Sequence, residues 1–147
     1  MEIRMSGTVG SVLKQKGNEV WFITPDQSVY EAIERMAFKA VGALLVLSSG
    51  KLVGIISERD YARKVILHHK SSKDITVAEI MTDKVLYVRP TQTVDQCMAL
   101  MTDKHIRHLP VLDADRLIGV LSIGDLVKAT ISEQDFVIRQ LESYIRS

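Results

Sequence analysis

Two short stretches of the chain carry the same pattern, Gly-x-x-Ser-x-x-Asp. They read GIISERD at residues 54–60 and GVLSIGD at residues 119–125, and each includes the end of an apolar run. A carboxylate accepts two hydrogen bonds at once, which matches the adjacent 2′- and 3′-hydroxyls of a ribose. A serine at the start of a helix lies beside free backbone amides, where a phosphate binds well. The pattern therefore predicts contacts to a nucleoside phosphate, with each glycine allowing close approach to the strand.

The same residues also have a purely structural interpretation. A serine that ends a strand and caps a helix, with an acid three positions later, is close to a capping box. An acidic side chain in the first turn also suits the helix dipole. Two features favour a ligand: both copies use aspartate where a capping box prefers glutamate or glutamine, and the pattern occurs twice. Both interpretations stay open at this point.

The duplication extends well beyond the two motifs. Shifting the sequence by 65 residues aligns Val20 with Val85 and Asp60 with Asp125 without a gap. Thirteen residues of this span meet an identical partner, and most other pairs are conservative. Agreement in a single register over about 40 residues indicates an internal repeat.

Each copy predicts the order strand, helix, strand, strand, helix. Helices are expected to start at Ser28 and Thr93, which are typical N-cap residues, and again at Ser57 and Ser122. The first strand of each copy stops at a proline, and the next two strands read as a hairpin. The expected strands are 20–24, 42–47 and 52–57 in the first copy, and 85–89, 108–112 and 117–122 in the second. This pattern predicts an α/β fold with two tandem β-α-β-β-α repeats.

The two copies are expected to pack together, because a unit of about 50 residues buries too little apolar surface to be stable alone. Similar segments, TVGSVL at 8–13 and TVAEIM at 76–81, predict a short helix leading into each copy. The expected organisation is a first repeat with its lead-in at 1–67, a linker at 68–75, a second repeat at 76–131 and a C-terminal helix at 132–147. The tail has an apolar stripe at helical spacing that must cover either the core or a second subunit: Phe136, Val137, Leu141, Tyr144 and Ile145.

Composition argues against several classes of partner. The net charge of the 147 residues is +1, with no basic stripe, so we expect no nucleic-acid partner. The longest apolar run, VGALLVL at 41–47, is far shorter than the roughly 20 residues of a membrane span, so we expect no membrane partner. The start, MEIRMSGTVG, lacks the apolar segment of a secretory signal, and a single cysteine, Cys97, suits a reducing compartment. These features predict a cytoplasmic protein.

Other chemistry finds little support in the sequence. Cys97 aligns with Ala32 on the apolar stripe of a helix, which predicts a buried hydrophobic side chain. The histidines lack the cysteine or carboxylate that would complete a metal site, so none is expected: they are His68, His69, His105 and His108. Because no Walker-type loop, Gly-x-Gly-x-x-Gly or Gly-x-Ser-x-Gly occurs, we also expect no catalysis.

The repeated unit, its two closing motifs and the segments TVAEIM and IRHLPVLD (106–113) resemble a stand-alone pair of cystathionine-β-synthase-type (CBS) domains, also called a Bateman module. The resemblance covers nearly the whole chain. It implies two repeats packed pseudo-symmetrically, sheet against sheet, into one disc-like module. Clefts between the repeats would bind an adenosine compound: AMP first, with ADP, ATP, NAD and S-adenosylmethionine as further candidates. Such a module would act as a regulatory sensor in signal transduction.

Carried over residue by residue, the resemblance implies two clefts, each built crosswise from both repeats. In one cleft, Ser122 and Asp125 would hold the ribose of a nucleotide whose base rests on the first repeat. In the other, Ser57 and Asp60 would face the second repeat. Phosphate contacts are expected from Arg59, Arg107 and His108. The implied adenine pockets consist of Pro25, Tyr30, Val41, Gly42, Ala43, Ile55, Pro90, Ile106 and Val120.

The two sites are not expected to be equal. Arg59 lies within the first motif and Arg107 would lie opposite, so this site should suit a more heavily charged ligand. In the second motif Ile123 and Gly124 take the corresponding places, and His108 is the expected nearby cation. That site should suit AMP or a nucleoside.

We further expect a homodimer and a regulated partner protein of unknown identity. The alternative function is that of an interaction module, a dimer with vestigial clefts whose tail helix docks a partner.

Overall fold

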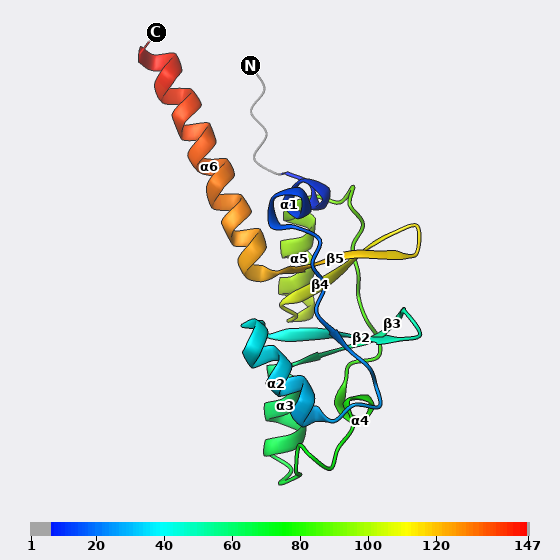
Figure 1. The fold of residues 1–147 in the computed structure, drawn as a ribbon. Helices are drawn as coiled ribbons and strands as arrows, with labels where there is room; N and C mark the ends of the chain where they lie inside the picture. Colours follow the sequence, from blue (N-terminus) through cyan, green and yellow to red (C-terminus); the bar gives the residue numbers. More distant parts are fainter. Residues whose placement is uncertain (1–6, 147) are drawn as a thin grey trace. The chain divides into compact units, whose positions relative to one another are not determined.

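The computed structural model describes residues 7–146. Residues 1–6 of the expected first repeat and residue 147 of the expected C-terminal helix lie outside the described part. The chain divides into two units (Figure 1). The first-repeat unit is Val20–Val85, and the second-repeat unit joins the segment up to Glu19 with the segment from Leu86 onward. Contacts therefore place the first lead-in segment with the second repeat, whereas the expected boundaries simply followed chain order.

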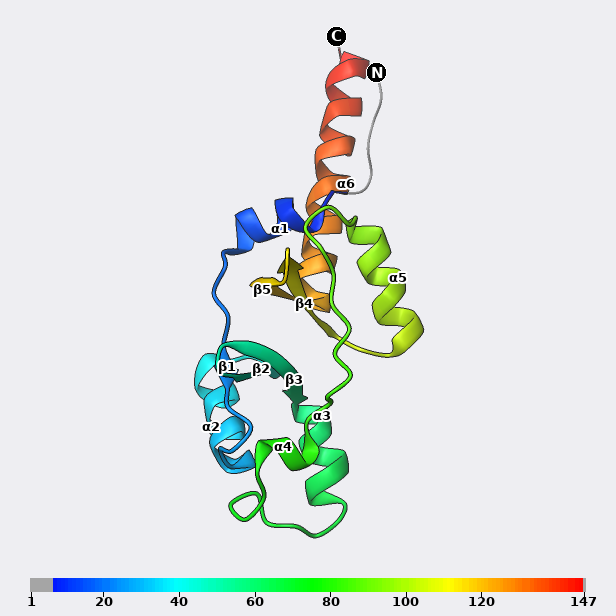
Figure 2. The same ribbon diagram turned by 90° about the vertical axis from the view of Figure 1, so that its right-hand side faces the viewer.

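The first-repeat unit is a three-stranded sheet with helices on one face (Figures 1 and 2). The strand order is β1-β2-β3, with β1 parallel to β2 and β2 antiparallel to β3. Its elements are β1 (Phe22–Ile23), α2 (Val29–Lys39), β2 (Ala43–Ser48), β3 (Lys51–Ser57), α3 (Glu58–Tyr61), the π-helix η1 (Ala62–Ile66) and α4 (Val77–Ile80). The expected order of strand, helix, hairpin and helix is confirmed.

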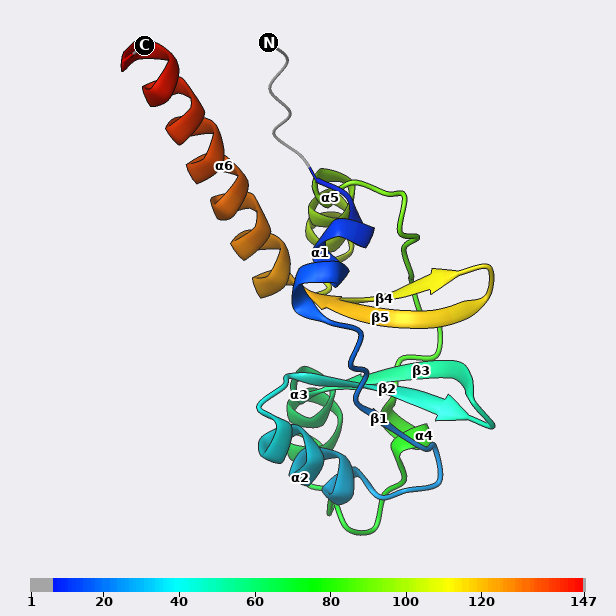
Figure 3. The same ribbon diagram turned by 45° about the horizontal axis from the view of Figure 1, so that its top comes forward.

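The second-repeat unit has a two-stranded sheet, again with its helices on one face (Figure 3). Its elements are α1 (Val9–Lys16), α5 (Val94–Lys104), β4 (His108–Asp113), β5 (Arg116–Ser122) and α6 (Ile123–Arg146). β4 and β5 are antiparallel with the same register as β2 and β3, so that His108 pairs with Ser122 as Ala43 pairs with Ser57. The helix expected from Ser122 and the tail helix expected from Ser132 are one continuous helix, α6.

The strand expected at 85–89 was wrong: the structure has only an isolated parallel bridge between Val88 and Val111. In the first repeat the amide of Leu45 donates to the carbonyl of Trp21 over 3.2 Å. The residue that corresponds to Leu45 is Pro110, which has no amide hydrogen and cannot donate the matching bond. The ladder is therefore shorter in the second repeat.

Local capping explains where the main helices begin and end. The hydroxyl of Ser28 accepts a hydrogen bond from the amide of Glu31 (3.1 Å), and Thr93 forms a capping box with Gln96. Both helices end at a left-handed residue, with φ of 54° at Ala40 and 55° at the corresponding residue of the second repeat. The expected N-caps at Ser28 and Thr93 are thus confirmed.

Each unit has its own apolar core, and the two cores use corresponding residues. Ala32, Met36 and Ile56 are buried in the first, and their counterparts Cys97, Met101 and Leu121 are buried in the second. Cys97 is fully buried among apolar residues, as its alignment with Ala32 predicted, and burial raises the pKa of its thiol.

The lead-in helices are fixed to the repeats by main-chain hydrogen bonds. In the second-repeat unit the amide of Gly10 in α1 donates to the carbonyl of Pro90 (2.9 Å). In the first-repeat unit the amide of Ala78 in α4 donates to the carbonyl of Pro25 (3.0 Å). Each lead-in helix therefore completes the unit of the other repeat rather than the one that follows it in the sequence.

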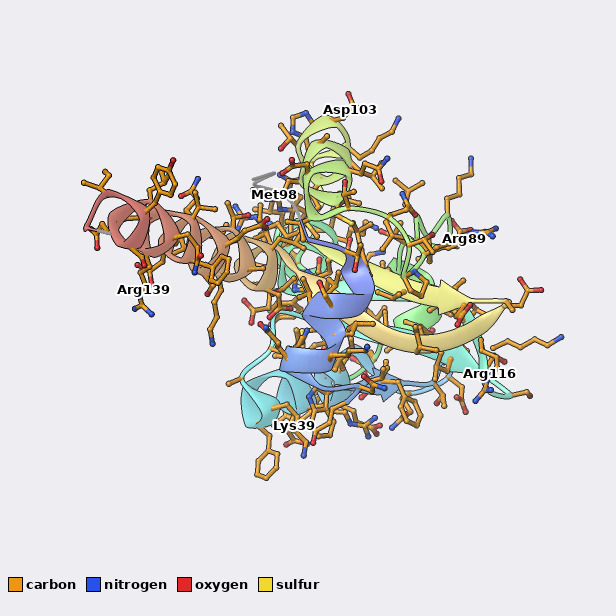
Figure 4. All side chains as sticks on the ribbon, turned by 90° about the horizontal axis from the view of Figure 1, so that it is seen from above. Lys39, Arg89, Met98, Asp103, Arg116 and Arg139 are labelled. Carbon is orange, nitrogen blue, oxygen red and sulfur yellow. The ribbon has the colours of Figure 1, made fainter. Side chains whose placement is uncertain are left out.

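From Ile131 onward, α6 carries many exposed apolar side chains. The exposed large apolar residues from Ile131 onward are Ile131, Phe136, Ile138, Leu141, Tyr144 and Ile145. In Figure 4 side chains spread outward around this part of the helix, including the labelled Arg139, which pairs with Asp135 at 3.0 Å. These large apolar side chains therefore stay exposed in the part of the chain that the structure describes. No helix within residues 7–146 is long and apolar enough to cross a membrane.

Candidate functional site

The two Gly-x-x-Ser-x-x-Asp motifs lie at corresponding junctions between a strand and a helix. Ser57 ends β3 and is the N-cap of α3. Ser122 ends β5, and α6 begins at the next residue. The same hairpin register and the same motif produce this junction twice, once in each unit.

At the first motif the serine and the aspartate form a complete capping box. The amide of Ser57 donates to Oδ2 of Asp60 over 2.9 Å, and the amide of Asp60 donates to Oγ of Ser57 over 3.1 Å. The Ser57 hydroxyl also donates to Oδ2 of Asp60 (3.0 Å). Aspartate is therefore long enough to reach the cap amide, and the sequence argument that aspartate disfavours a cap was wrong.

The other oxygen of Asp60 is held by a lysine one turn further along the same stretch of helix. Oδ1 of Asp60 lies 3.2 Å from Nζ of Lys64. The same ammonium donates to the carbonyl of Ile80 over 2.8 Å, which joins the helix after the motif to the end of α4. The carboxylate is largely covered, with 14% of the Asp60 side chain exposed.

The second motif repeats the cap but takes its cation from elsewhere. The amide of Ser122 donates to Oδ2 of Asp125 (2.8 Å), and the amide of Asp125 donates to Oγ of Ser122 (3.1 Å). Nζ of Lys16, the last residue of α1, lies 2.6 Å from Oδ2 of Asp125 and 2.6 Å from the carbonyl oxygen of Val120. Asp125 and Lys16 are 109 residues apart in the chain.

These contacts control the ionisation of Asp125. Burial alone raises the pKa of this carboxyl group, because it disfavours the charged form. The hydrogen bond from Lys16, the amide of Ser122 and the positive charge of Lys16 outweigh burial, so that the pKa lies below its ordinary value. The site therefore holds a carboxylate and an ammonium group as a partly buried pair.

The sequence shows that Lys16 belongs to a duplicated lead-in, but not that this lead-in contacts the second repeat. TVGSVLKQK at 8–16 aligns with TVAEIMTDK at 76–84, which makes Lys16 part of the duplicated lead-in. The residue that corresponds to Lys64 in the second repeat is Ala129, so Asp125 lacks the cation that Asp60 has in its own helix. In the structure the cation on Asp125 comes from another element, α1.

His108, the cation expected at the second motif, has a lowered pKa, and its contact with a phosphate stays a prediction. It lies opposite Ser122 in the β4–β5 pair, and burial lowers the pKa of its imidazole, as does the nearby charge of Lys16. The Coulombic effect of Asp125 acts in the opposite direction but is smaller. The structure places the ammonium of Lys16 on Asp125, and the lowered pKa of His108 disfavours its charged form.

The remaining predicted residues are distributed between the two units. In the second-repeat unit the amide of Ile123 donates to the carbonyl of Arg107 (2.9 Å), which fixes the start of β4 beside the motif. In the first-repeat unit the amide of Glu58 donates in the same way to the carbonyl of Gly42 (3.1 Å). The second-repeat unit contains Pro90, Ile106, Arg107, His108, Val120, Ser122 and Asp125. The first-repeat unit contains Pro25, Tyr30, Val41, Gly42, Ala43, Ile55, Ser57, Arg59 and Asp60.

The two glycines of the motifs admit the protein's own side chains. A Cβ at Gly54 would lie 2.6 Å from Sδ of Met81, and a Cβ at Gly119 would lie 2.8 Å from Cδ2 of Leu13. Met81 and Leu13 occupy corresponding positions of the two lead-in segments. Another group does approach each glycine closely, as predicted, but that group is a side chain of a lead-in segment rather than a ligand.

A separate hollow of about 300 Å³ lies in the second-repeat unit between α1, α5 and α6. It is lined by Gly7, Ser11, Val12, Gln15, Val94, Ala129, Ser132, Glu133 and Phe136. None of these residues belongs to a Ser-x-x-Asp motif. In the part of the chain that the structure describes, no three histidine, cysteine or acidic side chains group as a metal site would require.

Comparison with known proteins identifies the architecture. Residues 9–67 and 77–132 match the CBS domain family. The mitochondrial CBS domain-containing protein CBSX3 of Arabidopsis thaliana is 42% identical over 150 residues, which cover 96% of this chain and 73% of that protein. The structure of a candidate signal-transduction protein with CBS domains from Burkholderia ambifaria is 53% identical, with a TM-score of 0.84, over 87% of this chain and 96% of that one.

A third comparison concerns a protein solved with ligands. The CBS domain pair of protein MJ0100, in complex with 5′-methylthioadenosine and S-adenosyl-L-methionine, is 26% identical with a TM-score of 0.76. The match covers 86% of this chain and 98% of that one. With both repeats matched and the β-α-β-β-α order complete in the first repeat, the chain belongs to the CBS domain family and carries a tandem pair of these domains.

Proposed function

We propose that this CBS pair is a regulatory module that binds an adenosine compound at its Ser-x-x-Asp motifs and does not turn it over. The observation that carries the proposal is the pair of partly buried carboxylates, Asp60 and Asp125, held at corresponding strand-to-helix junctions. A carboxylate fixed by its own backbone is preorganised to accept the two hydroxyls of a ribose.

The helix cap does not use all the acceptor positions of the aspartate carboxylate, so some remain for a ligand. A carboxylate has about four lone-pair positions. At Asp125 the contacts from the Ser122 amide and from Lys16 both use Oδ2. Oδ1 of Asp125 therefore keeps acceptor positions for a ligand hydroxyl while the cap stays intact.

The ligands of MJ0100 support the choice of an adenosine compound. 5′-Methylthioadenosine and S-adenosyl-L-methionine share the adenosine group and differ beyond it. We propose AMP as the first candidate for this chain, followed by ADP, ATP, NAD and S-adenosylmethionine. Signalling would follow if the ligand favours one conformation of the pair over another.

Isothermal titration of the purified chain with each candidate tests the proposal. At one hundred times its dissociation constant, a ligand that binds only the folded state should stabilise it by about 2.7 kcal/mol, measured by thermal or chemical unfolding. The titration also tests the expected asymmetry: the motif with Arg59 should favour ATP over AMP more strongly than the motif with Gly124. Equal preferences at both sites would contradict that asymmetry.

Aspartate-to-glutamate variants separate the cap from the ligand contact. Glutamate is the preferred third residue of a capping box, so D60E and D125E should keep the helix starts and the free energy of unfolding. A ribose contact needs the carboxylate at one position, and the extra methylene should weaken binding at the changed site by at least about tenfold. S28A, which removes the N-cap of α2 instead, is the matched control and should lower stability without changing the dissociation constant. Full binding in both glutamate variants would contradict the proposal.

The exposed apolar side chains of α6 favour a second candidate, an interaction module. Helices of soluble domains normally bury such a face, and large exposed patches mark interaction sites. We propose that α6 serves a homodimer contact, and that a regulated partner protein reads the ligand state. A cytoplasmic location is also our proposal; the Arabidopsis relative is named as mitochondrial.

A further inference from the structure

Lys16 contacts one of the two carboxylate oxygens that the proposed ligand would use at the second motif. Its ammonium group contacts Oδ2 of Asp125, the carboxylate proposed for the ribose, and the carbonyl of Val120, which lies on the strand that leads into the motif. Both distances are 2.6 Å, at the short end for hydrogen bonds from an ammonium group.

The position of Lys16 is set by packing at its end of α1. Leu13 lies against Gly119 and is only 4% exposed, so α1 is fixed on β5 one turn before Lys16. The helix then stops at Gly17, whose φ of 101° suits glycine and whose amide donates to the carbonyl of Leu13 over 2.7 Å. Lys16 therefore projects from a fixed helix end toward the motif.

The first motif is arranged differently. Its cation, Lys64, lies in the same stretch of helix as Asp60 and is 45% exposed, against 31% for Lys16. Lys64 contacts Oδ1 of Asp60, whereas Lys16 contacts the cap oxygen Oδ2 of Asp125. Because Ala129 stands where a lysine matching Lys64 would be, the ammonium of Lys16 is the cation that the structure places on Asp125.

A ribose that uses both oxygens of Asp125 therefore has to rearrange this ion pair. When two ribose hydroxyls bind the carboxylate, the partly covered ammonium of Lys16 loses some or all of its anionic partner, which is costly for a half-desolvated charge. A neutral nucleoside offers no replacement. A 5′-phosphate offers an anion with several acceptor oxygens, to which the flexible lysine can turn.

We propose that Lys16 determines ligand specificity at the Ser122–Asp125 motif, by selecting a nucleotide with a 5′-phosphate over the neutral nucleoside. This inference rests on the proposed function, and it sharpens the expectation from sequence that this site suits AMP or a nucleoside. In the free protein Lys16 neutralises Asp125; in the complex it pairs with the phosphate.

The test compares AMP with adenosine at the second motif alone. Titrations use the full chain with D60A, which removes the carboxylate of the first motif, and circular dichroism checks that each variant is folded. In this parent AMP should bind at least about tenfold more tightly than adenosine, the effect of one charge-assisted hydrogen bond. K16M should bring the two dissociation constants to within about threefold, by weakening AMP and strengthening adenosine.

Two further variants complete the design. K16R keeps a cation and should retain the preference for AMP, and K14M, which removes the other lysine in the last turn of α1, should leave the ratio unchanged. K16Q replaces K16M if the latter fails to fold. A ratio that is the same in the parent, K16M and K16Q overturns the role of Lys16 but leaves nucleotide binding intact. If AMP binds neither the unaltered chain nor the D60A parent, both the proposed function and this inference are overturned.

Discussion

Leu13 fills the space that a side chain at Gly119 would need, since a Cβ there would lie 2.8 Å from Cδ2 of Leu13. Met81 stands in the same relation to Gly54 in the other unit, at 2.6 Å. Each glycine is thus a docking point for the lead-in segment that precedes the other repeat in the sequence. The duplicated pattern Gly-x-x-Ser-x-x-Asp therefore has two roles. Its glycine leaves room for the lead-in segment to pack. Its serine and aspartate form the helix start and would contact the proposed ligand.

We predict that alanine at these glycines destabilises the protein, and more at Gly54 than at Gly119. At Gly54 the new methyl also meets the backbone oxygen of Thr82 at 3.0 Å, whereas at Gly119 the three nearest atoms all belong to the side chain of Leu13. Overpacking of this kind costs about 1–3 kcal/mol, measured as the change in free energy of unfolding in urea.

Gly124→Ala is the matched control for the glycine variants. The nearest atom to a Cβ there is Oγ of Ser122 at an ordinary 3.6 Å, and the residue lies in the first turn of α6. Alanine should be neutral or stabilise the helix by up to about 1 kcal/mol. A loss of stability at Gly124 equal to that at Gly54 would contradict the packing argument.

The order of elements could be predicted from the sequence because apolar periodicity, N-caps and prolines are local signals. The repeat register by itself assigns Cys97, Met101 and Leu121 to a core, since Ala32, Met36 and Ile56 occupy the same positions of the first copy. The loss of the strand at 85–89 traces to Pro110, which lies on the neighbouring strand β4, so the residues of 85–89 themselves did not reveal it.

The parts of the site that could not be predicted depend on contacts distant in sequence. Nothing local to α1 indicates that it joins the second repeat, and Lys16 meets Asp125 only because of that exchange. The preference of a capping box for glutamate was misleading for a similar reason. A statistical preference for side-chain length does not decide what a given strand-to-helix junction allows, and Asp60 and Asp125 both reach the cap amide.

His108 should make stability depend on pH near neutrality. Its folded-state pKa lies below the ordinary value of 6.5 because burial disfavours the imidazolium. The unfolded chain then binds the proton more readily, so stability is full above pH 6.5 and falls as the pH drops below it. Free energies of unfolding between pH 8 and 5 should show this fall, and His108→Gln should remove its share. A fall in stability that survives His108→Gln unchanged would refute the assignment to His108.

The Lys16–Asp125 pair should contribute stability that disappears in acid. The folded-state pKa of Asp125 lies below its ordinary value of 3.8, so the contribution is complete above that pH and is lost as the pH falls through the folded-state pKa. K16M should lower the free energy of unfolding at pH 7, and the difference from the unaltered chain should vanish in strong acid. Because both side chains are partly exposed, the difference should also shrink in high salt. A difference that stays constant across pH and salt would mean that Lys16 acts through its aliphatic stem.

The exposed end of α6 should carry the self-association that we propose. Leu141, Tyr144 and Ile145 are 44%, 76% and 81% exposed, which is costly for apolar groups of this size unless a partner covers them. Replacing all three by glutamine should lower the dimer mass seen in size-exclusion chromatography with light scattering, while the core clusters and thus the circular dichroism spectrum stay the same. Replacing the ion pair of Asp135 and Arg139 on the same helix by glutamines is the control and should leave the mass unchanged, since exposed pairs contribute little. A dimer that survives the apolar substitutions would place the subunit contact elsewhere, while a monomeric unaltered chain would reject self-association altogether.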